Sequence, residues 1–166
     1  MKETYFMETP IGWLKIVSEA DTIIALDYAD EADVVEGEDG RNDLEGASGV
    51  IRQCVRELEE YFAGSRTTFE VPVSFGHKGT EFQQKVWRRL REIPYGETLS
   101  YKALAADCGG PNHSRAVANA NGRNPISIIV PCHRVIASDG TLGGYTGGVG
   151  KKRRLLEREG LDIRPK

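Results

Sequence analysis

A cysteine and a histidine stand side by side in the apolar segment IIVPCHRVI, residues 128–136. A thiol reacts well at neutral pH only when its pKa is lowered, which a nearby histidine, a cation or a helix N-terminus can do. Neighbouring residues on a strand point to opposite faces, but Pro131 is compatible with a bend that brings Cys132 and His133 together, directly or through a water. Such a histidine needs an orienting acceptor, usually a carboxylate. The residues alone leave three interpretations open: a nucleophile with its base, two metal ligands, or two neighbours in a core.

The other cysteines and histidines do not form an obvious second site. The chain has three cysteines and three histidines, without a CxxC motif or zinc-binding spacing. Cys54 falls on the apolar face of a predicted helix and is expected to lie in a core. We therefore expect neither a disulfide framework nor a metal site.

Charge is distributed unequally along the 166 residues, although the net charge is only -3. Residues 1–78 carry 7 basic and 17 acidic side chains, and residues 79–166 carry 15 basic and 8 acidic ones. An acidic half followed by a basic half predicts two domains with these bounds. The basic half either faces a polyanion or carries solvated charge, and charge alone favours neither.

The hydropathy pattern gives no sign of a membrane segment. No apolar run approaches the roughly 20 residues that span a bilayer. The first ten residues, MKETYFMETP, lack the apolar core of a signal peptide. We expect a cytoplasmic protein with no membrane partner.

The first half predicts a small sheet with one helix. Residues 3–29 contain three short runs typical of strands, and residues 30–49 are acidic and glycine-rich, which predicts a loop. Apolar residues recur at helical spacing over residues 50–64. Residues 69–75 predict a short extended piece, in which Pro72 disfavours a central strand.

The second half predicts a helix-turn-helix. Thr80 can cap a helix over residues 81–93, and Ser100 can cap a helix over residues 101–107. A glycine-bearing turn then leads to a short helix over residues 113–122. Two short helices around such a turn are typical of DNA-binding domains, although the pattern is weak by itself.

The end of the chain combines a buried run, a glycine-rich loop and a basic helix. Residues 126–132 predict a buried extended segment, and residues 139–150 predict a loop. In the basic helix over residues 151–160, Leu155 and Leu156 can pack inward. The string KKRR in this helix either contacts phosphate or remains solvated.

Four stretches in the second half resemble a known family when taken in order: IPYGETLSYKALA, SRAVANANGRNP, NPISIIVPCHRVI and GGYTGGVGKKRRLLEREG. They are similar to segments of the O6-alkylguanine-DNA alkyltransferases, also called methylated-DNA–protein-cysteine methyltransferases. The resemblance covers about residues 80–160. It implies an α/β (α+β) fold, with an N-terminal ribonuclease-H-like sheet domain and a helical C-terminal domain bearing a winged helix-turn-helix.

The resemblance also implies a catalytic set. Cys132 matches the cysteine that accepts the alkyl group irreversibly, and His133 matches the base that takes the thiol proton, through a water. Glu159 matches the carboxylate that orients this histidine. Tyr101 matches the residue that rotates the 3′ phosphate and donates a proton to the departing guanine, and Asn124 matches the brace of the active-site turn. No cofactor is implied.

Further matches imply contacts to DNA and to the substrate. Such a protein acts as a monomer on double-stranded DNA through the minor groove, and flips O6-alkylguanine out of the duplex. Arg115 matches the residue that fills the gap, and Ala116, Ala118 and Ala120 let the helix lie close. The remaining matches on this helix or its end, Ser114 and Arg123, belong to the same DNA-binding set.

The substrate pocket is expected to include Tyr145, Thr146, Val135 and Ser127. The loop with Tyr145 and Thr146 matches the wall of the pocket, and the carbonyl of Val135 matches an acceptor for the guanine amino group. Ser127 replaces a proline found in some members, which suggests a less restricted pocket. Arg134 matches a structural tie. Activity on O4-alkylthymine stays open.

Three other functions compete with alkyl transfer. Alkyltransferase-like binding proteins share the fold but lack the cysteine, which disfavours them here. Regulators that use methylated cysteine as a signal usually carry extra domains. An unrelated cysteine hydrolase would need an oxyanion hole, for which the sequence gives no separate sign.

Overall fold

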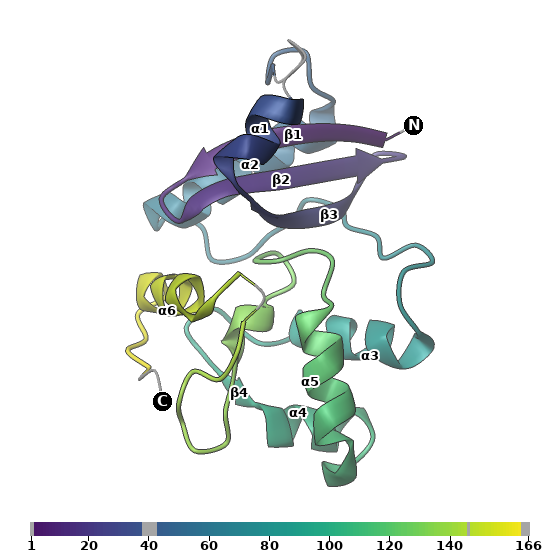
Figure 1. The fold of residues 1–166 in the computed structure, drawn as a ribbon, viewed down its shortest axis with the longest axis vertical. Helices are drawn as coiled ribbons and strands as arrows, with labels where there is room; N and C mark the ends of the chain where they lie inside the picture. The colour runs from purple at the N-terminus through teal and green to yellow at the C-terminus, as the bar shows by residue number, and fades with distance from the viewer. Residues whose placement is uncertain (1, 38–42, 146, 164–166) are drawn as a thin grey trace. The chain divides into compact units, whose positions relative to one another are not determined.

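The computed structural model describes residues 2–37, 43–145 and 147–163, which form two compact units. The first unit is Met1–Gly76 and the second is His77–Lys166 (Figure 1). The division therefore lies two residues before the boundary expected from charge.

Three antiparallel strands form the sheet of the first unit: β1 (Lys2–Thr9), β2 (Gly12–Glu19) and β3 (Thr22–Ala29), in the order β1-β2-β3. This confirms the strands expected within residues 3–29. The helix α2 (Gly49–Ala63) packs against all three strands. Its N-cap is Ser48, and its buried face includes Cys54, which is a core residue as expected.

The prediction of a loop over residues 30–49 is wrong at its beginning, where α1 spans Glu31–Gly37. Asp30 and Asp33 cap this helix reciprocally, because each carboxylate accepts a hydrogen bond from the other residue's backbone N–H, at 2.8 and 3.0 Å. Acidic residues in the first turn also interact favourably with the helix dipole. Residues 38–42 lie outside the described part of the chain.

Residues 69–75 approach the sheet at one point, where Val73 forms a parallel bridge with Ile23 of β3. The buried carboxylate of Glu57 fixes the segment by accepting hydrogen bonds from the backbone N–H groups of Glu70 and Val71, at 2.9 and 3.0 Å. The expected short extended piece is thus held by one side chain of α2.

The second unit contains the predicted helix-turn-helix. Its helices are α3 (Glu81–Leu90), α4 (Tyr101–Cys108) and α5 (Ser114–Gly122), with a short 3₁₀ turn between α4 and α5. Thr80 and Ser100 cap α3 and α4 as expected, although α3 ends three residues early. A hydrogen bond joins α3 and α5: Nε1 of the buried Trp87, in α3, donates to the carbonyl of Ala120, in α5, at 2.7 Å.

The expectation of an extended run over residues 126–132 is wrong, although the run is buried. The chain turns back on itself, with Ile128 at φ 69° and the N–H of Val130 donating to the carbonyl of Ile126. The Asn124 amide holds this turn, because its Nδ2 donates to the same Ile126 carbonyl and, at 2.8 Å, to that of Val130. A side chain thus supplies the backbone partners that a neighbouring strand would otherwise give.

Cys132 lies directly after this turn, in the 3₁₀ segment η2 (Cys132–Arg134). The following strand β5 (Val135–Ile136) pairs in parallel with β4 (Leu99–Ser100), which leads into α4. The segment η2 is therefore attached at one end to α5, through the Asn124 turn, and at the other end to α4.

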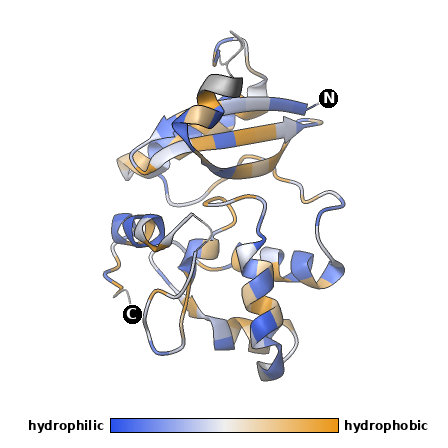
Figure 2. Ribbon diagram, in the orientation of Figure 1, coloured by the Kyte–Doolittle hydropathy of each residue, from blue (hydrophilic) through white to orange (hydrophobic). Residues whose placement is uncertain are grey.

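The last helix, α6 (Val149–Arg158), is mostly hydrophilic along its length (Figure 2). Leu155 and Leu156 are nevertheless fully buried, as expected. Glu159 follows the last turn and is buried as well. Across the described ranges, no helix is long and apolar enough to cross a membrane.

The close approach of Gly79 to α3 provides a test of this packing. A Cβ at Gly79 would lie 2.5 Å from the ring of Trp87, which is 2% exposed and hydrogen-bonded. Gly79→Ala should cost about 1–2 kcal/mol for its left-handed backbone (φ +70°) and about 1–3 kcal/mol more for overpacking. The free energy of unfolding, measured in urea by circular dichroism, reports both.

Gly140→Ala is the matched control within the same unit. Gly140 has φ +87°, but a Cβ there meets nothing within 4 Å. This control variant should lose only the backbone contribution. Equal destabilisation of the two variants would show that the indole ring moves aside and does not fix α5.

Candidate active site

A buried carboxylate lies at the centre of the polar groups behind the cysteine. Glu159 Oε2 is 2.7 Å from His133 Nε2, and Glu159 accepts two hydrogen bonds from Arg134, at 2.8 and 3.2 Å. Arg134 also donates through Nη1 to the carbonyl of Ile93 at 2.7 Å. His133 is 0% exposed, and Glu159 and Arg134 are 5% and 6% exposed. The structure brings together the predicted residues Cys132, His133 and Glu159 from η2 and the end of α6.

The protonation states follow from these contacts. Burial would raise the pKa of Glu159, but its hydrogen bonds and charge attraction to His133 and Arg134 outweigh burial and lower the pKa to about 2. Burial lowers the pKa of His133. At neutral pH the pair is therefore a carboxylate and a neutral imidazole.

The hydrogen bond to Glu159 also assigns the histidine tautomer. A carboxylate only accepts, so Nε2 of His133 carries the ring proton and Nδ1 keeps its lone pair. Nδ1 is buried and has no hydrogen-bond partner within the described residues. The ring is thus arranged as a base whose free nitrogen is available to a nearby acid.

Cys132 is 2% exposed, and burial raises the pKa of its thiol. Hydrogen bonding to Asn124, the charge of Lys152 and hydrogen bonding to Tyr145 act in the opposite direction. Desolvation therefore keeps the resting thiol protonated, while its neighbours favour the thiolate once a base removes the proton.

Lys152 is a functional candidate that the sequence reasoning missed. The KKRR string was expected to contact phosphate or remain solvated, but Lys152 is 0% exposed. Its Nζ donates to the carbonyls of Val135 at 2.6 Å and Gly144 at 3.0 Å, and lies 5.7 Å from the centre of the Tyr101 ring. Burial lowers its pKa to about 8. The signal was its spacing, because residues 152, 155 and 156 share one helix face.

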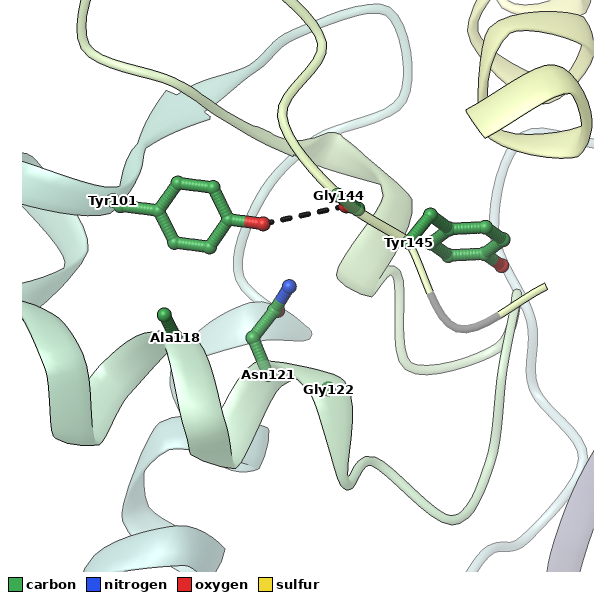
Figure 3. A pocket seen from close by; sticks show the side chains of 6 residues that line it. All are labelled: Tyr101, Ala118, Asn121, Gly122, Gly144 and Tyr145. Carbon is green, nitrogen blue, oxygen red and sulfur yellow. Dashed lines mark hydrogen bonds between the residues drawn. The ribbon is translucent and has the colours of Figure 1, made fainter. Parts of the chain in front are cut away.

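A pocket opens between α4, α5 and the loop before α6 (Figure 3). Its volume of about 420 Å³ falls within the roughly 300–1,000 Å³ of small-molecule sites. Tyr101 Oη donates to the carbonyl of Gly144 at 3.5 Å across it. The pocket is lined by Tyr101, Ala118, Asn121, Gly122, Gly144 and Tyr145. Tyr101 and Tyr145 were predicted near the substrate, whereas Asn121 was missed because nothing distinguished it from a surface residue of a short helix.

The other predicted pocket residues are placed differently. Ser127 is 3% exposed and lies in the Asn124 turn. Val135 is fully buried, and its carbonyl binds the ammonium of Lys152. Thr146 lies outside the described residues.

The predicted DNA-binding residues lie on α5 or at its end. Arg115, Ala116, Ala118 and Arg123 are exposed, and Ser114 is partly buried. The expectation that Ala120 faces DNA is wrong, because Ala120 is fully buried against α3. In the ranges that the structure describes, no three potential ligands come close enough to hold a metal ion.

The fold and the site define a helix-turn-helix unit that carries a cysteine with a histidine–carboxylate base. One family model, "6-O-methylguanine DNA methyltransferase, DNA binding domain", matches residues 81–161, and another, "6-O-methylguanine DNA methyltransferase, ribonuclease-like domain", matches residues 1–75. The chain belongs to the 6-O-methylguanine DNA methyltransferase family, as its sequence suggested.

Individual relatives are similar over almost the whole chain. The methylated-DNA–protein-cysteine methyltransferase of Mycobacterium tuberculosis is 43% identical over 92% of this chain and 89% of its own length. The constitutive enzyme of Bacillus subtilis is 44% identical over 96% of both. The crystal structure of M. tuberculosis OGT in complex with DNA has a TM-score of 0.79 and 40% identity, and covers 94% of this chain and 91% of that one. These similarities confirm the expected α/β fold, with a small sheet unit and a helical unit.

Replacing Lys152 tests its influence on the thiol. In Lys152→Met the ammonium that lowers the pKa of Cys132 is lost while most of the packing stays, so this pKa should rise. The pKa is measured as the ultraviolet absorbance of the thiolate against pH, after subtraction of the corresponding Cys132→Ser protein. Arg154→Met, which removes an exposed charge of the same helix, should leave the titration unchanged. An identical curve for Lys152→Met would show that this lysine only packs.

The low pKa of Glu159 predicts an acid-dependent contribution to stability. Because its pKa falls from 4.5 to about 2 on folding, the stabilisation is present above pH 4.5 and is lost as the pH falls through 2. Wild type should therefore be more stable than Glu159→Gln near neutrality, and the difference should shrink between these pH values.

Urea unfolding at a series of pH values measures this difference. Glu157→Gln, at a residue exposed near the end of the same helix, should give a small and nearly constant offset. A constant difference between wild type and Glu159→Gln would contradict the assigned charge state.

Proposed function

We propose that this protein repairs DNA by transferring the alkyl group of O6-alkylguanine to its own Cys132. The observation that carries the proposal is the buried contact of His133 with Glu159 beside Cys132, within a unit that matches the family's DNA-binding domain. Close relatives bear the name methylated-DNA–protein-cysteine methyltransferase. Position 132 is a cysteine, which disfavours a protein that only binds the lesion.

The reaction is a single displacement at the alkyl carbon. Nδ1 of His133 takes the thiol proton, through a water, and Glu159 stabilises the imidazolium that forms. Sγ of Cys132 bonds to the alkyl carbon as the bond from that carbon to O6 breaks, and Tyr101 donates a proton to the departing guanine. The product is a thioether, which is not hydrolysed, so each molecule reacts once. The step needs no cofactor.

DNA reaches the site through α5. A guanine inside a duplex must leave the stack, at a cost of a few kcal/mol. Arg115 is exposed on α5 and fills the gap, while the small exposed residues Ala116 and Ala118 allow the helix to lie in the minor groove. Ser114 and Arg123 contact the backbone. The pocket beside Ala118 and Tyr101 receives the base, and the protein acts as a monomer.

Mass spectrometry tests the proposal directly. The intact protein is incubated with an equimolar duplex that contains one O6-methylguanine, and then digested. The Cys132 peptide should gain the mass of one methyl group, while the peptides of the buried cysteines Cys54 and Cys108 should not. Cys132→Ser should bind the same duplex without any gain. Binding without transfer by the wild type would leave recognition intact but overturn the assigned chemistry.

A further inference from the structure

Asn121 lies where the helix α5, the segment η2 and the pocket meet. It is in the last turn of α5, is 5% exposed and lines the pocket. Its Nδ2 donates to the backbone carbonyl of Cys132 at 3.4 Å. Because a carbonyl only accepts, this contact decides which end of the amide is the nitrogen. Figure 3 shows this nitrogen pointing into the space between Tyr101 and Gly144.

The second hydrogen of this amide nitrogen is available to Tyr101. An amide nitrogen carries two hydrogens, and the Cys132 carbonyl takes one of them. The hydroxyl oxygen of Tyr101 lies on the wall of the same pocket and forms a hydrogen bond with the Asn121 amide. Burial raises the pKa of the Tyr101 hydroxyl, and this hydrogen bond works in the opposite direction. The amide therefore favours the ionised phenol.

The proton of the Tyr101 hydroxyl is held much less firmly than its oxygen. It is donated to the carbonyl of Gly144 at 3.5 Å, well beyond the roughly 2.7–2.8 Å of a usual O–H···O hydrogen bond. The same carbonyl accepts a hydrogen bond from the ammonium of Lys152 at 3.0 Å. The hydroxyl can thus turn away from Gly144 without leaving that carbonyl unpaired, and its proton is free to reach a base in the pocket.

We infer that Asn121 is a positioning residue that acts through Tyr101: its amide N–H holds the hydroxyl oxygen and stabilises the tyrosinate that forms when Tyr101 gives its proton to the departing guanine. The inference rests on the proposed function, in which Tyr101 is the acid. It gives a side chain of α5 a part in the chemical step as well as in DNA binding. A neutral amide suits this part because it stabilises an anion without offering a competing acidic proton.

The negative charge moves through the site in a fixed order. After His133 has taken the thiol proton, the charge is on Sγ of Cys132, where it opposes ionisation of Tyr101. The bond from sulfur to the alkyl carbon forms as the bond from that carbon to O6 breaks, which moves the charge to guanine. Guanine takes the proton of Tyr101, and the charge then lies against the Asn121 amide. The tyrosinate later regains a proton and the imidazolium releases one, so the net transfer is of the thiol proton to guanine.

The contact is tested without DNA by titration of Tyr101. Tyrosines are replaced by a ring-fluorinated analogue, which ionises at lower pH, and are followed by fluorine NMR, with Tyr101→Phe identifying the signal. In Asn121→Leu, which keeps the volume but lacks the donor, Tyr101 should ionise at a higher pH than in wild type. Asn121→Ala lacks the donor as well and makes the same comparison if leucine does not fit. Asn119→Leu, at an exposed residue of the same helix, should leave the titration unchanged.

A double-mutant cycle tests the effect on the reaction. Single-turnover rates of methyl transfer from a duplex with O6-methylguanine are measured at saturating protein for wild type, Asn121→Leu, Tyr101→Phe and the double variant. Asn121→Leu should slow transfer roughly three- to tenfold, the size of one hydrogen bond, when Tyr101 is present, and much less in the Tyr101→Phe background. Effects through stability or through the Cys132 carbonyl occur in both backgrounds and cancel.

The inference is overturned by an unchanged Tyr101 titration in Asn121→Leu, or by equal slowing in the two backgrounds. Either result would leave Asn121 with a purely structural role. Absence of methyl transfer by the wild type would instead contradict the proposed function, and the titration would still report whether the amide binds the phenol.

Discussion

The site depends on one buried negative charge, the carboxylate of Glu159. A carboxylate without partners could not remain ionised in this environment, because burial strongly favours its neutral form. The two hydrogen bonds from Arg134 and the contact with His133 reverse that preference. The ionised carboxylate then fixes the imidazole tautomer, and this leaves Nδ1 free to act as a base. Loss of Arg134 would leave the buried carboxylate of Glu159 without a compensating charge.

The same burial that would raise the pKa of Glu159 also raises the pKa of the Cys132 thiol. Burial keeps the Cys132 thiol protonated and thereby protects it from reagents that enter without a correctly placed base. Hydrogen bonding to Asn124 and the ammonium of Lys152 favour the thiolate, and in the proposed reaction the thiol proton moves to Nδ1 of His133. A residue that reacts irreversibly gains from such restraint, because each unproductive reaction consumes one molecule.

Sequence patterns predicted the elements that depend on local rules. The caps at Thr80 and Ser100 and the apolar spacing of the helices were sufficient for α3, α4 and α5. The prediction for residues 126–132 was wrong because their hydrophobicity indicates burial but not the direction of the chain, and the turn is held by the side-chain amide of Asn124. The helix α1 forms in a segment whose composition is typical of a loop, because Asp30 and Asp33 cap it reciprocally. Local periodicity carries no information on such side-chain contacts.

The residues of the site also divide into those that the sequence indicated and those that it did not. Cys132 and His133 are conspicuous because they are adjacent, and the resemblance located Glu159, but a buried lysine in a basic string and an asparagine in a short helix have no distinctive composition. What distinguishes Lys152 and Asn121 is that each binds a backbone carbonyl of the reactive segment, Val135 for one and Cys132 for the other. Because both side chains also contact the pocket wall, a base that enters the pocket meets groups already attached to the nucleophile. The pocket wall and the segment that carries the thiol are therefore linked through the same few hydrogen bonds.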